Sequence, residues 1–137
     1  MVLLYPTNIK NQKQHKQKIK GLEYRVTTLE FGSFGLRALE TGRLTSKQIE
    51  AARQAISRKI KKKGKLWIRI FPQLAVSSKP NEVRMGKGKG AFSFWVCPIK
   101  AGKILYEIKG LSIAVAKEAL YAGASKLPIN TQMVSLL

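Results

Sequence analysis

The residue types that catalysis and metal binding require are scarce in this chain. It has one histidine, His15, and one cysteine, Cys97, and all seven of its acidic residues are glutamates. A catalytic triad needs a carboxylate that orients a histidine base, but His15 lies in a polar segment without any acid. One cysteine allows no intramolecular disulfide and no cysteine zinc site. We therefore expect no enzyme activity, no metal and no cofactor, and we interpret His15 as phosphate-contacting or solvent-exposed.

The segment Met85–Gly90, with its alternating glycines and lysines, is the next candidate for chemistry. It lacks the final hydroxyl residue of a Walker A loop, and its Gly-x-Gly-x-Gly spacing is not the dinucleotide fingerprint. Glycines let a backbone approach a ligand closely and leave N–H donors bare, while Arg84, Lys87 and Lys89 add charge. The spacing fits either contact with an RNA backbone or a mobile hairpin tip kept soluble by lysines.

Positive charge dominates the chain, which carries 26 Lys and Arg residues against seven acids, a net charge of +19. Such a surface repels itself and demands a polyanion. The basic residues concentrate at 10–20, 58–65 and 84–89, and these segments contain no acid. Together they could engage on the order of ten phosphates. Solubility alone needs a net charge of only about 2–8.

Nucleic acid and anionic membrane are the two polyanions to compare. The apolar run 91–99 is far shorter than the ~20 residues of a membrane span, and the expected helix after Thr45 lacks Trp or Phe anchors on its apolar face. No motif for reading DNA bases and no RRM-type aromatic motif is present. Recognition of a large folded RNA by shape and backbone fits best.

The hydrophobic pattern predicts one α+β domain over 21–137, preceded by a basic N-terminal extension over 1–20. The extension has too few apolar residues to offset its ordering entropy, so we expect it to be flexible until it meets a partner. Strands are expected at 24–31, 34–40 (ended by Gly42), 66–71, 74–77, 82–85, 92–96, 103–108 and 131–136. Cys97 is expected to pack as a small hydrophobe.

Two helices are expected among these strands. The first begins with a capping box formed by Thr45 and Gln48, and Gly64 is expected to stop it. Its apolar face is formed by Ile49, Ala52, Ile56 and Ile60. The second runs from near Ser112 to before Pro128, with an expected apolar face of Ile113, Ala116, Leu120 and Ala124. Strands and helices in this order favour an α+β sandwich.

Blocks of residues along nearly the whole chain resemble one known family. The chain is similar to bacterial-type large-subunit ribosomal protein sixteen, which is related to the archaeal and eukaryotic ten-e proteins. The resemblance rests on Phe31–Leu36, Gly42–Thr45, Gln48–Arg53, Trp67–Pro72, Lys79–Pro80, Val83–Gly90 and Lys126–Pro128. It implies a hammerhead-type α/β sandwich with two main helices, mixed but mostly antiparallel strands and a basic N-terminal arm.

The resemblance also implies partners, which composition does not show. They are large-subunit rRNA, neighbouring large-subunit proteins and A-site tRNA near the peptidyl-transferase region, with P-site tRNA as an alternative; no membrane and no homo-oligomer are expected. The candidate rRNA-binding residues are Lys10, Lys13, His15, Lys16, Lys18, Arg37, Arg43, Arg58, Lys61, Lys62 and Lys63. The candidate tRNA-facing loop is Arg84, Met85, Gly86, Lys87, Gly88, Lys89 and Gly90. A free RNA-binding regulator or RNA chaperone is the competing function.

The chain departs from the family pattern in its arm. Thr7, Asn8 and Gln12 stand where the family has basic residues, so contacts there are in doubt. Its 19 lysines outnumber its seven arginines, a bias that suits an A+T-rich genome. With no leader peptide recognised, this bias favours an organelle-encoded chain in a mitochondrial ribosome, with a plastid or a bacterial cytoplasm as the alternatives.

Overall fold

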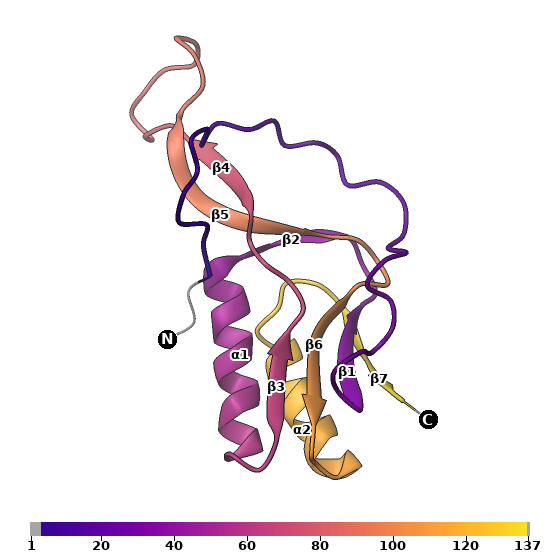
Figure 1. Cartoon of the computed structure of the whole chain (residues 1–137). Coiled ribbons are helices and arrows are strands. Elements are labelled where there is room, and N and C mark those ends of the chain that lie inside the picture. The colour runs from indigo at the N-terminus through magenta and orange to yellow at the C-terminus, as the bar shows by residue number, and fades with distance from the viewer. Residues whose placement is uncertain (1–3, 137) are drawn as a thin grey trace.

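Two antiparallel sheets and two helices build the fold of this chain, which is an α+β fold as predicted (Figure 1). The structure is a computed structural model that describes residues 4–136. The elements in chain order are β1 (Phe34–Ala38), β2 (Gly42–Thr45), α1 (Ser46–Ile60), β3 (Lys65–Ile68), β4 (Leu74–Ser78), β5 (Ala91–Ile99), β6 (Ile104–Lys109), α2 (Ile113–Ala124) and β7 (Thr131–Ser135).

The larger sheet has the strand order β3-β6-β1-β7, and the smaller has the order β2-β5-β4. All the described strand pairs are antiparallel. The strands β5 and β6 connect the two sheets through the turn at Lys100–Lys103, and β4 and β5 form a hairpin that projects away from the helices (Figure 1). No helix within residues 4–136 has the length and apolar character to cross a membrane.

Helix α1 follows the prediction closely. The Thr45 side chain accepts from the Gln48 backbone N–H, and the Gln48 side chain accepts from the Thr45 N–H, which completes the capping box. The predicted apolar face is the buried face. The helix ends at Ile60 rather than near Gly64, because Lys61 takes the left-handed conformation with φ of 47°.

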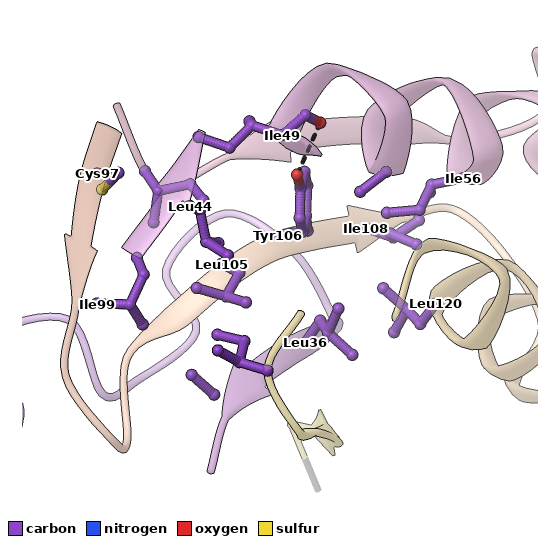
Figure 2. Close-up of a cluster of buried hydrophobic side chains, with 14 of the residues drawn as sticks. Leu36, Leu44, Ile49, Ile56, Cys97, Ile99, Leu105, Tyr106, Ile108 and Leu120 are labelled. Carbon is purple, nitrogen blue, oxygen red and sulfur yellow. Dashed lines mark hydrogen bonds between the residues drawn. The ribbon is translucent and has the colours of Figure 1, made fainter. Parts of the chain in front are cut away.

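The core lies between the larger sheet and the two helices and extends to the smaller sheet, which contributes Leu44, Cys97 and Ile99 (Figure 2). The Tyr106 ring from β6 is fully buried there, and its hydroxyl donates to the Ile49 carbonyl of α1 at 2.9 Å. This bond satisfies the one polar atom of the ring, which burial would otherwise make costly. Cys97 is buried as predicted, and burial raises the pKa of its thiol.

The predicted apolar face of α2 is partly wrong. Ala116 and Leu120 are buried with Ala119 and Gly123, whereas Ile113 is 64% exposed. The buried face of α2 consists mainly of small residues, because α1 packs closely against it there. A Cβ on Gly123 would lie 2.5 Å from Ile56 Cγ1.

Two predicted strands are also wrong. Residues 24–31 are irregular: Val26 accepts a single bond from the Ile104 N–H of β6, and the N–H groups of Glu30 and Phe31 donate to the Glu107 carboxylate rather than to a neighbouring strand. Residues 82–85 form exposed turns at the end of the β4–β5 hairpin, where no neighbouring strand can pair with them. Gly42, expected to end a strand, instead begins β2, and the strand expected over 66–71 ends at Ile68.

Candidate nucleic-acid interface

The N-terminal arm, defined here as residues 8–20, crosses the smaller sheet without regular secondary structure (Figure 1). The Arg43 guanidinium on β2 donates to the Gln17 carbonyl at 2.7 Å, and the Lys13 ammonium donates to the Lys89 carbonyl at 3.3 Å. The Lys89 ammonium in turn donates to the Gln14 carbonyl. The arm therefore lies beside the hairpin tip, although some 75 residues separate them in the sequence.

The glycine-lysine loop, defined as Arg84–Gly90, forms the tip of the β4–β5 hairpin (Figure 1). Residues 84–89 are exposed. Gly86, Lys87 and Gly88 all have positive φ, a conformation that glycine adopts without steric cost. At the base of the tip, a Cβ on Gly90 would lie 2.4 Å from the Ser78 carbonyl oxygen, so only glycine fits between the two strands. The loop thus presents backbone and ammonium groups together.

A hollow of about 560 Å³ opens between the arm and the β5–β6 turn. Its lining includes His15, Lys18, Lys20, Arg43, Lys100 and Lys103. Its one carboxylate, Glu23, pairs with Lys103 at 3.6 Å. Burial acts to raise the pKa of Glu23, but the Arg25 N–H and the Lys103 ammonium outweigh it and hold the pKa below its usual value. The hollow is therefore net cationic near neutral pH.

The third predicted group of basic residues lies apart from the arm and the loop. Arg58, Lys61, Lys62 and Lys63 are exposed at the end of α1, at the opposite end of the molecule from the hairpin tip (Figure 1). Arg58, Lys61 and Lys62 line a hollow of about 570 Å³ between α1 and β3. Arg37, on β1, donates to the Gln132 side chain at 3.0 Å. Apart from Arg37, the predicted residues therefore form two separate basic regions.

Most carboxylates form ion pairs outside the arm and the loop, although Glu23 lines the hollow beside the arm and Glu82 is exposed near the hairpin tip. Five glutamates in the described chain form ion pairs, Glu50 with Arg53, Glu118 with Lys59, Glu23 with Lys103, and both Glu30 and Glu107 with Arg69. The arm and the loop contain none. The positive charge of the arm and the loop is therefore only partly compensated within the chain.

Some residues of this surface were not predicted. Lys100 and Lys103 line the hollow beside the arm, and Arg69 holds two glutamates, but none of the three was a candidate. The alternation of residues 66–71 places Arg69 on the face opposite the apolar residues, and this pattern could have marked it as a candidate. Lys100 and Lys103 flank a turn, and only the tertiary fold brings that turn to the arm.

The geometry of this surface suits electrostatic contact. Residues 4–136 contain no cluster of metal-ligating side chains. Exposed cations on loops and turns, with acids paired elsewhere, are typical of proteins that bind the phosphates of nucleic acids. The class defined by fold and surface is a strongly basic α+β protein built to meet a polyanion.

Comparison with known proteins identifies the family within this class. The chain belongs to the ribosomal protein L16p/L10e family, whose model matches residues 6–134. It is 54% identical over 132 residues to the large ribosomal subunit protein uL16 of Psychrobacter arcticus, covering 96% of both chains. It is 53% identical over 135 residues to the protein of the same name from Maricaulis maris, covering 98% of both. The suspected family is thereby confirmed, and the chain is a ribosomal protein.

Proposed function

We propose that this chain is a structural constituent of the large ribosomal subunit that binds large-subunit rRNA and helps to position A-site tRNA near the peptidyl-transferase region. The observation that carries the proposal is the contact between the arm and the glycine-lysine loop, through Lys13 and Lys89. This contact joins two acid-free basic segments into one surface. The bacterial relatives named above carry the name of a large-subunit protein.

Converging RNA strands repel one another through their phosphates, and a surface of this kind reduces that repulsion. The arm offers its exposed candidates Lys10, Lys13, His15, Lys16 and Lys18 to rRNA. The loop offers Lys87 and Lys89 on a hairpin that projects from the body (Figure 1). A projecting tip can reach a second RNA while the arm holds the first, so we assign the loop to tRNA and the arm to rRNA.

The loop assignment is tested by reversing its charge. Large subunits assembled with the Lys87→Glu and Lys89→Glu double variant should bind A-site tRNA more weakly, because two attractions become repulsions. Binding of labelled tRNA to the A site of assembled ribosomes measures the effect. The deficit should shrink as salt rises, since screening weakens both attraction and repulsion.

A matched control carries the same change of charge elsewhere. Lys47 on α1 and Lys117 on α2 are exposed and lie outside the arm and the loop. The Lys47→Glu and Lys117→Glu double variant should retain normal A-site occupancy. Normal occupancy in the loop variant, or an equal loss in both variants, would remove the loop's assigned role.

The same proposal places the ribosome in an organelle, with a mitochondrion favoured. It rests on the excess of lysine over arginine and on the divergence of the arm at Thr7, Asn8 and Gln12. The relatives named above are bacterial, so a bacterial cytoplasm is the alternative. Fractionation of source cells with an antibody to the chain decides between them, because recovery outside organelles would overturn the organellar assignment.

A further inference from the structure

Two aromatic rings lie together on the larger sheet, at a site that the arm and the loop do not touch. The rings of Phe31 and Trp67 are stacked, with centroids 6.0 Å apart and an interplanar angle of 20°. Trp67 alternates along β3 with Leu66 and Ile68, which pack on the core, so its side chain points to the sheet face away from the helices. Phe31 is 49% exposed. We call this pair the aromatic platform.

Buried polar contacts hold the platform in place. The Glu107 carboxylate, fully buried on β6, accepts the Phe31 N–H at 2.7 Å and the Gly32 N–H at 2.8 Å. It also pairs with Arg69, whose guanidinium lies 4.9 Å from the centre of the Phe31 ring. The backbone that carries the ring is thus held in place before any ligand arrives, which reduces the entropy lost on binding.

The platform borders a basic hollow. A depression of about 310 Å³ is lined by Trp67 and by four lysines, Lys62, Lys63, Lys65 and Lys109. No carboxylate lines it. The Lys65 ammonium lies 5.4 Å from the centre of the indole ring, and Lys65 is exposed, so it can turn toward a phosphate. The two glutamates nearest the platform, Glu30 and Glu107, are both held by Arg69.

We infer that the aromatic platform binds an unpaired RNA nucleotide, with its base against Trp67 and Phe31 and its phosphate among the lysines of the hollow. Stacking on aromatic side chains beside a basic groove is how proteins hold single-stranded RNA. A protein partner fits less well, because lysine is depleted at protein–protein interfaces. The inference deepens the proposed rRNA binding, on which it rests, by adding a base-contacting site on the sheet.

Two single-tryptophan forms of the full chain test the inference. Trp95→Phe leaves Trp67 as the only tryptophan, and Trp67→Phe leaves Trp95, which is 9% exposed and lies in the smaller sheet. Each is titrated with a 12-residue oligouridine and with heparin, a polyanion without bases. Anisotropy of labelled oligouridine, measured in parallel, reports total RNA binding through every basic segment.

If the base stacks on Trp67, oligouridine should quench the fluorescence of Trp67 in a saturable way and heparin should not. The fluorescence of Trp95 should not be quenched in this way. Changing Lys65→Gln and Lys109→Gln in the Trp67-only form should raise the oligouridine concentration at half-quenching. RNA binding by anisotropy without quenching of Trp67, or equal effects of heparin and oligouridine, would overturn the platform while leaving the proposed function intact. Absence of any RNA binding would overturn both.

A second measurement covers the case in which Trp95→Phe fails to fold. Large subunits containing the unaltered chain are irradiated with ultraviolet light, and nucleotide adducts on its peptides are mapped by mass spectrometry. An adduct on the peptide that contains Trp67 supports the inference. A crosslink from that peptide to a neighbouring protein, with no nucleotide adduct, contradicts it.

Discussion

At the scale of single residues, Glu107 connects several distant parts of the chain through its carboxylate. Its carboxylate accepts N–H groups from Phe31 and Gly32 and pairs with Arg69, although it is fully buried. Burial acts to raise the pKa of Glu107, but these N–H groups and the guanidinium outweigh it and hold the pKa below its ordinary value of 4.5. One charge thereby fixes the irregular segment before β1 against β6.

We predict that Glu107→Gln lowers the free energy of unfolding by about 3 kcal/mol at pH 7, because it leaves Arg69 without its buried partner. A depressed carboxyl pKa contributes stability above the unfolded value, and that contribution is lost as the pH falls through the folded value. The difference between wild type and variant should therefore narrow below pH 4.5.

Urea unfolding at pH 7 and in the acid range measures this difference. Glu107→Asp serves as the comparison. Its carboxylate still titrates, but its shorter side chain lies farther from Arg69 and from the N–H donors. A deficit of Glu107→Gln that is the same at pH 7 and at pH 3.5 would show that the ion pair is not what stabilises the segment.

The sequence could not reveal this role. The strand expected at 103–108 correctly contains Glu107, but the partners of its carboxylate lie 38 residues away at Arg69 and 76 residues away at Phe31. Local periodicity contains no information on contacts at that separation. The error over residues 24–31 has the same source, since the N–H groups of Glu30 and Phe31 bind the distant Glu107 carboxylate instead of a strand, which outweighs the local β propensity.

At the scale of elements, the two helices show where pattern predicts packing and where it does not. In α1, isoleucines at helical spacing and a capping box give two agreeing signals, and both are confirmed. In α2, the buried face depends on small residues that allow α1 to approach. The helical spacing correctly placed Ala116 and Leu120 in the core but also placed Ile113 there, where it is not.

We predict that Gly123→Ala destabilises the protein by about 1–3 kcal/mol, even though alanine is the better helix former. Its Cβ would lie 2.5 Å from Ile56 Cγ1 and 2.7 Å from Ile56 Cδ1, so α1 or the isoleucine must shift. Combining Gly123→Ala with Ile56→Val removes the Cδ1 atom and should restore part of the loss. Thermal unfolding of the three variants completes a double-mutant cycle.

Additive effects in that cycle would contradict direct contact between the two side chains. A stabilising Gly123→Ala would contradict the close helix packing itself. Ala116→Gly on the same helix is a suitable control, because it changes helix propensity without adding an atom. It should cost about 1 kcal/mol from propensity, plus the packing of the buried Ala116 methyl group.

At the scale of the whole molecule, the fold gathers positive charge into regions that hold few carboxylates. The three basic segments were visible in the sequence as acid-free runs, because charge is a compositional property that needs no structure. Their arrangement was not visible. The β4–β5 hairpin brings the loop to the arm, while α1 carries its basic end to the other end of the molecule (Figure 1).

This arrangement predicts contact with more than one RNA segment. The arm and the loop form one basic region, and the end of α1 with the aromatic platform forms another. A protein held at two ends is retained more strongly than either contact alone allows, because the second contact becomes intramolecular once the first has formed. Retention should therefore survive salt that releases a protein bound by one exposed patch.

Sedimentation of native ribosomes tests the central claim most directly. Extracts are separated on gradients, large subunits are collected and washed at high salt, and the chain is detected with an antibody. The account predicts that the chain sediments with large subunits and stays with them through the wash. Release at moderate salt, with no association with subunits, would contradict it and favour a free RNA-binding regulator or chaperone.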